Sequence, residues 1–243
     1  MKLSSRIFAI VLVIVLLGSM SVFAATEYWG NFSDYSAGLY SASHASYMYR
    51  TTTYAQARSI INSNSGSLPP GTMGVNPRAY NATSGTLIIT GGWHYTSGTS
   101  VGYDVPVDVT SFPGYVYSQG MTALWNGVGY TTRSTTASPN AQFKSPSRSI
   151  QINAAGETFG SSAYAESLED EPDLVLAEGV GGMVGYVKSS DLNSGAAKSP
   201  EEAAKSTIDK NTRFIPLYES DGKTVIGRFK IAPDTERIIT IVD

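Results

Sequence analysis

Few side chains in this sequence could carry out nucleophilic catalysis. The chain of 243 residues contains two histidines, His44 and His94, and no cysteine. Serine is abundant, but no Gly-x-Ser-x-Gly segment supplies the strained turn that exposes a hydrolase serine. We interpret His94 as a strand residue between two aromatic neighbours, and we expect His44 to lie exposed at the surface. The sequence therefore assigns no catalytic residue.

Carboxylates are the remaining candidates for catalysis. Hydrolysis by a pair of acids requires the two carboxyl groups about 5–10 Å apart across a cleft. The first half of the chain offers only Glu27, Asp34, Asp104 and Asp108, and the last two point the same way from one expected strand. A carboxylate-dependent extracellular hydrolase is therefore an alternative function. Whether the protein is an enzyme stays open, with a non-enzymatic protein favoured.

A second group of carboxylates could in principle bind a cation. Glu166, Glu169, Asp170, Glu171 and Asp173 lie close together and carry the oxygen ligands that Ca²⁺ prefers. The run lacks the EF-hand spacing and its central glycine, so we interpret it as a solvated acidic loop that leads into a strand. The sequence predicts no metal site and no cofactor.

Phosphate groups and nucleic acids are disfavoured as ligands. The glycine-rich segment 179–182 lacks the Lys and Ser/Thr of a phosphate-binding loop and predicts a hairpin turn instead. Beyond residue 24 the chain carries a net charge of about −5, which repels phosphate, and it has no row of Lys and Arg.

Aromatic side chains are the strongest candidates for binding. All three Trp and twelve of the fifteen Tyr precede residue 150. Such rings can stack on sugars or offer rigid contact area to a protein partner. The candidate ligand-binding residues are Trp93, Tyr95, Tyr115, Tyr117 and Trp125. The alternative interpretation, that they are packing residues of a thin sandwich, agrees with how often such side chains are buried.

Short strands separated by turn residues must position these rings. The segment 101–109 alternates apolar and polar residues, which predicts one buried and one wet face. Pro106 on the wet face predicts an edge strand. The segment 55–62 fits a helix or a strand. Further strands are expected at 47–54, 72–80, 86–90, 115–125 and 130–136, the last two joined at Asn126-Gly127. Residues 25–145 are therefore expected to form an antiparallel β-sandwich or partly open barrel.

The composition changes after residue 145. Residues 25–150 carry six basic and four acidic side chains, whereas 151–243 carry nine basic and sixteen acidic ones. Ser199, Pro200 and Glu202 form a capping box that predicts a helix running to about Asp209. Hairpins are expected at 174–187 and 214–231, and strands at 148–152 and 238–242. We therefore expect a mainly β protein whose residues 146–243 form a small, acidic α+β module.

Residues 1–24 have the layout of a secretory signal peptide. Lys2 and Arg6 precede an apolar run at 7–17, and compact residues at Val22 and Ala24 predict cleavage after Ala24. The alternative is an uncleaved membrane anchor. No cysteine is present to take a lipid, and no later segment is long and apolar enough to span a membrane. We expect the protein to be secreted or associated with the cell envelope.

Several segments resemble uncharacterised secreted two-module proteins of Gram-positive, Firmicutes-type bacteria. The segments that carry the resemblance include GTMGVNPRAY at 71–80, WNGVGY at 125–130, GETFG at 156–160 and DGKTVIG at 221–227. The resemblance implies export and a modular build, and no activity or site residue. Residues 185–192 also resemble the closing strand of a bacterial SH3-like module, and 91–95 are similar in texture to bacteriocins of the lactococcin 972 type.

Together these features favour an exported, non-enzymatic binding or structural protein at the cell envelope or outside the cell. Its expected partner is a cell-wall glycan or a surface protein, and it is expected to meet a membrane only through its leader. The carboxylate-dependent hydrolase is the first alternative. A bacteriocin-like toxin or a secreted inhibitor is the second, and killing or protease-inhibition assays would distinguish it.

Overall fold

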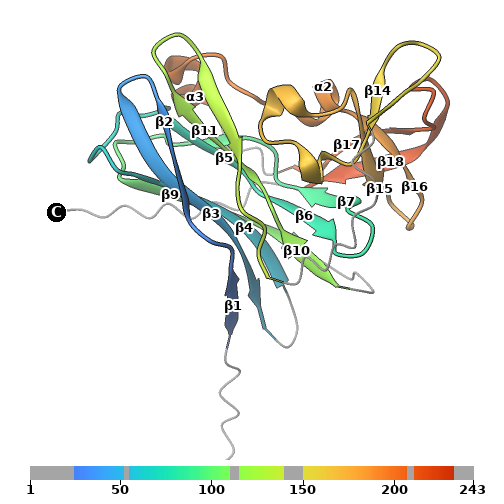
Figure 1. Ribbon diagram of the computed structural model, residues 1–243, viewed down its shortest axis with the longest axis horizontal. Helices are drawn as coiled ribbons and strands as arrows, with labels where there is room; N and C mark the ends of the chain where they lie inside the picture. Colours follow the sequence, from blue (N-terminus) through green and yellow to red (C-terminus); the bar gives the residue numbers. More distant parts are fainter. Residues whose placement is uncertain (1–24, 52–54, 110–114, 140–149, 207–210, 233–243) are drawn as a thin grey trace, which may run out of the picture.

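Strands dominate the folded part of the chain. The computed structural model describes residues 25–51, 55–109, 115–139, 150–206 and 211–232. Within these residues the chain forms sheets of five, four and nine strands, and most neighbouring strands are antiparallel (Figure 1). The prediction of a mainly β fold is confirmed.

The five-stranded sheet is built from the first part of the chain. Its path runs β1 (Thr26–Trp29), β3 (Tyr40–Arg50), β4 (Ala55–Ser63) and β9 (Gly102–Val109), and β2 (Ser33–Ala37) also pairs with β3. The ambiguous segment at 55–62 is thus a strand. Among the described strands β9 pairs with β4 alone, so it lies at the edge, as predicted from Pro106.

The alternation along β9 holds for its apolar face and fails for its polar face. Val105 and Val107 are buried, as expected, but Asp104 is also only 2% exposed. Asp104 accepts a hydrogen bond of 2.7 Å from the Tyr47 hydroxyl and forms an ion pair of 2.7 Å with Arg58. The expected wet face is wrong at Asp104 because these two long side chains of β3 and β4 cover it.

The four-stranded sheet contains the predicted turn at Asn126-Gly127. Its order is β12 (Tyr130–Ser134), β11 (Met121–Trp125), β5 (Met73–Asn76) and β8 (His94–Tyr95). The Asn126 side-chain oxygen accepts hydrogen bonds from the backbone N–H groups of Val128 and Gly129, at 3.0 and 2.9 Å. These bonds stabilise the turn of the β11–β12 hairpin.

The nine-stranded sheet is assembled from distant parts of the chain. Its order is β10 (Val116–Ser118), β6 (Arg78–Asn81), β7 (Leu87–Thr90), β18 (Val225–Ile231), β17 (Arg213–Tyr218), β16 (Val184–Lys188), β15 (Leu174–Glu178), β14 (Thr158–Gly160) and β13 (Gln151–Ile152). The hairpins β15–β16 and β17–β18 are those predicted at 174–187 and 214–231. The strand expected at 238–242 lies outside the described residues.

Two strands expected to be continuous are each divided where the chain passes from one sheet to another. Pro77 separates β5 from β6, and its missing N–H cannot continue a ladder. Gly120 separates β10 from β11 at a point of close packing. A Cβ atom there would lie 2.0 Å from the Ser59 hydroxyl oxygen and 2.4 Å from the Asn76 carbonyl oxygen. Only glycine fits this crossing without displacing its neighbours.

Helices in the second part of the chain are short. They are α2 (Ser189–Leu192) and α3 (Pro200–Lys205), together with the 3₁₀ helices η1 (Ser162–Tyr164) and η2 (Leu168–Asp170). The Ser199 hydroxyl accepts from the Glu202 N–H at 3.3 Å, as the capping box predicts. However, α3 ends at Lys205 instead of running to Asp209, because Ser206 leaves the helical region with ψ 117°. An α+β module at 146–243 is not confirmed.

The five-stranded sheet encloses hydrophobic cores with each of the other two sheets. The five-stranded sheet packs on the four-stranded one through side chains such as Ile61 and Leu124. It packs on the β6–β7 region of the nine-stranded sheet through side chains such as Val107 and Ile89. The five-stranded sheet thus forms one layer that faces parts of both other sheets.

Residues before and after 145 share one sheet. Parallel pairing places Ala177 of β15 opposite Leu87 of β7, and Ile231 of β18 opposite Thr90. In Figure 1 the late strands β14 to β18 lie beside β6 and β7. The two segments are therefore packed together, while the division into domains at residue 145 stays a prediction.

Candidate functional site

The aromatic residues predicted to bind a ligand occupy different environments. Trp93, Tyr95 and Tyr117 are buried, with 8%, 7% and 0% of their surfaces exposed. Trp125 is half-buried, and Tyr115 is 65% exposed. These rings do not form one solvent-facing surface, so their role in ligand binding stays a prediction.

Trp93, Tyr95 and Trp125 belong to one row of rings on the four-stranded sheet. Trp93 and Tyr95 stack with centroids 6.0 Å apart, and Tyr95 lies 5.1 Å from Tyr130. Tyr130 meets Trp125 edge to face at 5.3 Å. The row runs from the buried Trp93 to the half-buried Trp125, near the tip of the β11–β12 hairpin.

The buried end of this row is covered by the second part of the chain. The Trp93 indole N–H donates to the side-chain oxygen of Asn193 at 3.1 Å, and the Tyr95 hydroxyl accepts from the Ala197 N–H at 3.2 Å. Ala203 of α3 belongs to the same buried cluster as both rings. Burial raises the pKa of Tyr95, so its hydroxyl stays protonated at neutral pH. These rings hold the two parts of the chain together.

Tyr115 and Tyr117 lie apart from the row. Tyr117 stacks on Tyr80 with centroids 5.5 Å apart, inside the core shared by both parts of the chain. Tyr115 is separated from it by one residue and faces solvent. The strand expected to begin at Tyr115 begins instead at Val116, so Tyr115 precedes β10.

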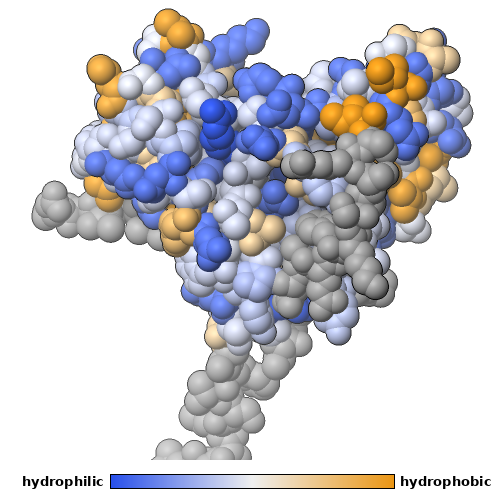
Figure 2. All heavy atoms as spheres, in the orientation of Figure 1, coloured by the Kyte–Doolittle hydropathy of each residue, from blue (hydrophilic) through white to orange (hydrophobic). Residues whose placement is uncertain are grey.

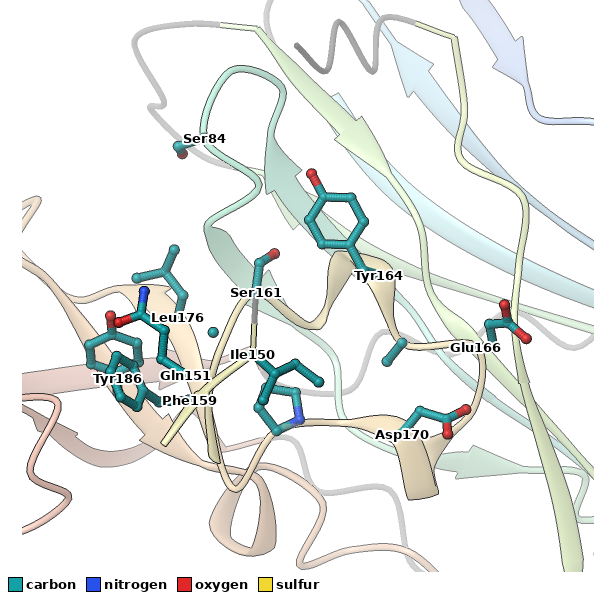
Figure 3. A pocket seen from close by; sticks show the side chains of 13 residues that line it. Ser84, Ile150, Gln151, Phe159, Ser161, Tyr164, Glu166, Asp170, Leu176 and Tyr186 are labelled. Atoms are coloured by element: carbon teal, nitrogen blue, oxygen red, sulfur yellow. The ribbon is translucent and has the colours of Figure 1, made fainter. Parts of the chain in front are cut away.

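A pocket lies among the strands and 3₁₀ helices of the second part of the chain (Figure 3). Its volume is about 530 Å³, within the range of small-ligand sites. It is bounded by β13 to β16, η1 and η2. The lining residues are Ser84, Ile150, Gln151, Phe159, Gly160, Ser161, Tyr164, Ala165, Glu166, Asp170, Pro172, Leu176 and Tyr186.

The Phe159–Tyr186 ring pair and two carboxylates occupy opposite sides of this pocket. Phe159 and Tyr186 meet edge to face on one side, with centroids 5.4 Å apart. Glu166 and Asp170 lie on the other side and are exposed (Figure 3). None of the described lining residues is Lys or Arg. The pocket therefore combines apolar ring surface with negative charge.

Hydrogen bonds to β12 hold the acidic side of the pocket. The Ser134 hydroxyl donates to the Ala165 carbonyl at 2.6 Å, and the Ser134 N–H donates to the Glu166 carbonyl at 2.8 Å. The Leu168 N–H donates to the Thr132 hydroxyl at 2.9 Å. Strand β12 thus fixes the backbone that carries Glu166.

A second cavity of about 430 Å³ adjoins the pocket. The two share Tyr164, Ala165 and Glu166, so this segment forms the wall between them. Asp34 and Arg133 contribute opposite charges to the second cavity. Its lining is the more polar of the two, and it contains none of the apolar ring pair of the first.

His44 lies in the second cavity and is only 3% exposed, so the expectation of an exposed His44 is wrong. Strand β3 runs inside the five-stranded sheet, and His44 packs there against β11. Its Nδ1 lies 2.7 Å from the Thr122 hydroxyl oxygen, which is 3.1 Å from the Tyr35 hydroxyl. Burial lowers the pKa of His44 to about 4, so its ring is neutral at pH 7.

The acidic run after residue 165 is divided by burial. Glu171 forms a fully buried ion pair with Arg78, so the expectation of a solvated loop is wrong there. Glu166, Glu169 and Asp170 remain exposed. Within the described ranges no cluster of three or more His, Asp or Glu side chains could hold a metal ion.

Sequence reasoning missed the residues of the pocket. Tyr164 and Tyr186 are isolated from other rings in the sequence, and Glu166 and Asp170 had been attributed to a solvated loop. The charge of that loop was the only signal in the sequence that pointed to a binding site there. The aromatic side of the pocket comes from β14 and β16, which precede and follow the loop. The pocket exists only once β14 and β16 pair with β15.

Comparisons with known proteins give no relative. No family model, no curated protein and no solved structure matches the chain. Among the described residues, no helix has the length and apolar character required to cross a bilayer. The geometry of the pocket is therefore the basis of the proposed function.

Proposed function

We propose that the protein is an exported binding protein that takes a neutral or amine-bearing glycan in the pocket between β13–β16 and the 3₁₀ helices. The observation that carries the proposal is the opposition of the Phe159–Tyr186 ring pair to the carboxylates of Glu166 and Asp170 (Figure 3).

The two sides of the pocket match the two kinds of surface on a sugar. Aromatic rings bury the apolar C–H face of a sugar ring at low entropic cost. Carboxylates accept hydrogen bonds from hydroxyl or ammonium groups on the sugar edge, and such charge-assisted bonds are the stronger ones. Uronic or sialic acids would place a second negative charge beside Glu166 and Asp170, so acidic glycans are disfavoured.

A glycan array followed by calorimetry tests this proposal. We expect the chain lacking residues 1–24 to bind neutral or amino-sugar oligosaccharides better than acidic ones. Tyr186→Ala should weaken binding about tenfold or more, because one wall of the pocket is removed. Tyr115→Ala, a change of the same kind at an exposed ring away from the pocket, is the matched control.

The charged side of the pocket has its own test. Glu166→Gln with Asp170→Asn keeps the size of both side chains, and both positions are exposed, so the fold should be retained. We expect weaker binding of amino sugars and a smaller preference against acidic sugars. An array without any binding, or equal binding by Tyr186→Ala and the parent chain, would contradict the proposal.

A glycoside hydrolase is the second candidate, favoured by the presence of two carboxylates, Glu166 and Asp170, in one pocket. One acid would protonate the leaving oxygen and the other would act as base or nucleophile. Release of reducing ends from a bound glycan would support this activity. Glu166→Gln or Asp170→Asn should then abolish the release while binding of neutral sugars is retained. Binding without turnover by the parent chain favours the non-enzymatic function.

Export and location belong to the same proposal. The basic and apolar leader supports secretion with cleavage after Ala24, and a glycan partner would place the protein at the cell envelope or outside the cell. Mass spectrometry of the protein recovered from the medium or envelope should give an N-terminus at Ala25. The finer architecture, a β-sandwich followed by an acidic α+β module, is likewise proposed.

A further inference from the structure

Two neighbouring hairpin tips expose aliphatic side chains almost completely. Leu39, at the turn between β2 and β3, is 94% exposed, and Val128, at the turn between β11 and β12, is 91% exposed. The turns touch, since a Cβ atom on Gly38 would lie 2.3 Å from the Asn126 carbonyl oxygen. Two bulky apolar groups therefore extend into water from neighbouring turns.

Both tips project from the body of the protein. A Cβ atom added at Gly127 or Gly129 would meet nothing within 4 Å. In Figure 1 the β2–β3 and β11–β12 hairpins extend on the same side, and Figure 2 shows hydrophobic atoms at their ends. The apolar surface is thus convex and can be inserted into another phase.

The surroundings of the tips match the layers of a lipid surface. Residues 35–49 and 121–132 contain no Asp, Glu, Lys or Arg. Behind the aliphatic ends lie the half-buried rings of Tyr40 and Trp125. Tyr and Trp are the side chains that prefer the headgroup region, while Leu and Val prefer the hydrocarbon below it. The order of side chains along the hairpins is therefore that of an interfacial anchor.

The backbone of the β11–β12 turn is also suited to an environment without water. The N–H groups of Val128 and Gly129 already donate to the Asn126 side chain, and the Asn126 N–H donates to the Gly129 carbonyl at 2.9 Å. Unpaired backbone groups would oppose insertion into hydrocarbon. This turn can lose its water without losing these hydrogen bonds.

The charged side chains of the segment next to the β11–β12 hairpin balance one another. Pro200 of α3 packs on Gly71, whose carbonyl accepts a hydrogen bond of 2.5 Å from the Tyr130 hydroxyl. Glu201 and Glu202 follow directly in α3 and are exposed. The exposed Lys198 and Lys205 flank them on the same segment, so these four charges cancel and do not favour anionic lipid. A protein partner fits less well, because a stable interface needs about 800 Å² on each side, far more than two side chains provide.

We infer that Leu39 and Val128 form a membrane-surface anchor that inserts into bilayers of zwitterionic lipid and holds the glycan pocket near that surface. The inference is independent of the identity of the pocket ligand. The two aliphatic side chains have about half the carbon atoms of a myristoyl chain, which predicts reversible binding weaker than that of a single lipid signal.

Vesicle flotation tests the anchor. The chain lacking residues 1–24 is used, because the apolar leader would bind lipid by itself and contributes to none of the described strands. We expect it to float with phosphatidylcholine vesicles, and Leu39→Ser with Val128→Ser should reduce the bound fraction about tenfold. Ile152→Ser with Val184→Ser changes two exposed aliphatic residues elsewhere and should float like the parent chain.

Lipid composition and depth provide two further readouts. Adding phosphatidylglycerol should leave binding nearly unchanged, because the charges near the tips balance. Brominated phosphatidylcholine should quench fluorescence from Trp125 but not from a Trp125→Phe variant. The inference is overturned if the parent chain does not float with phosphatidylcholine. It is also overturned if the double variant at the tips floats equally, or if binding requires anionic lipid.

Discussion

Arg78 and Glu171 form a fully buried ion pair that joins the two parts of the chain. Both side chains are 0% exposed, although the residues are 93 positions apart in the sequence. Burial alone would lower the pKa of Arg78, but the charge of Glu171 overcomes it, and the net pKa is raised. Arg78 therefore stays charged in the core of the protein.

Loss of one partner should destabilise the whole molecule. Glu171→Gln leaves the Arg78 charge buried without its counterion, and we expect a loss of about 3–5 kcal/mol in the free energy of unfolding. Urea denaturation measures this loss. Glu219→Gln, at an exposed acid, should change the free energy by less than about 0.5 kcal/mol.

Replacement of both partners should cost less than either single change. Arg78→Met with Glu171→Leu removes the buried charges together and fills similar volume, which is often neutral. The parent chain should unfold in a single transition, because both parts share one sheet and this ion pair. Separate transitions for the two parts, or a loss below about 1 kcal/mol in Glu171→Gln, would contradict this role.

Asn193 connects the ion pair to the aromatic row. Its side-chain oxygen accepts from Trp93 and from Arg78, both at 3.1 Å, and its amide donates to Glu171 at 2.8 Å. Asn193→Ala leaves these three groups without that partner, so we expect a loss of about 2–3 kcal/mol in unfolding free energy. Ser190→Ala, at an exposed position of α2, is the control and should be near neutral.

Gly120 should tolerate no side chain at the crossing between sheets. Gly120→Ala places a methyl group against the Asn76 carbonyl and the Ser59 hydroxyl, and we expect a loss of about 1–3 kcal/mol in thermal or urea unfolding. Gly98→Ala is the matched control, because a Cβ there meets nothing within 4 Å and its φ is not in the left-handed region. Equal stability of the two variants would show that the crossing can relax.

Local patterns were sufficient for the strands but not for their assembly. The edge strand β9, the turn at Asn126-Gly127 and the two late hairpins were predictable because each depends on neighbouring residues. The breaks at Pro77 and Gly120 were not, since they depend on which sheet each half of the strand joins. The shared nine-stranded sheet depends on pairing between residues such as Leu87 and Ala177, which no local pattern encodes.

The candidate site was less predictable than the fold. Ring type identified Trp93 and Tyr95 as candidates, but their burial arises from cover by 193–203, far away in sequence. The pocket residues Glu166 and Tyr186 carry no motif, and they meet only through the pairing of β14, β15 and β16. Charge and aromaticity could indicate binding chemistry, whereas the location of that chemistry required the tertiary structure.

His44 should make the protein less stable in mild acid. Its pKa is about 4 in the folded state, chiefly because of burial, with Asp34 opposing and Arg133 adding to the shift, against 6.5 when unfolded. Between these values the unfolded chain binds a proton that the folded chain does not, so stability falls as pH falls from 6.5 toward 4. We expect a loss of about 2–3 kcal/mol between pH 7 and pH 4.5 in urea unfolding.

The variant His44→Asn isolates this contribution. Asparagine can keep a hydrogen bond to the Thr122 hydroxyl, but it does not titrate, so the loss between pH 7 and 4.5 should shrink by most of that amount. The comparison uses the difference between two pH values for each variant, and a constant loss of stability from the substitution therefore cancels. If the pH dependence of His44→Asn equals that of the parent chain, other groups cause the acid sensitivity. His44 would then bind its proton in the folded state as it does in the unfolded chain.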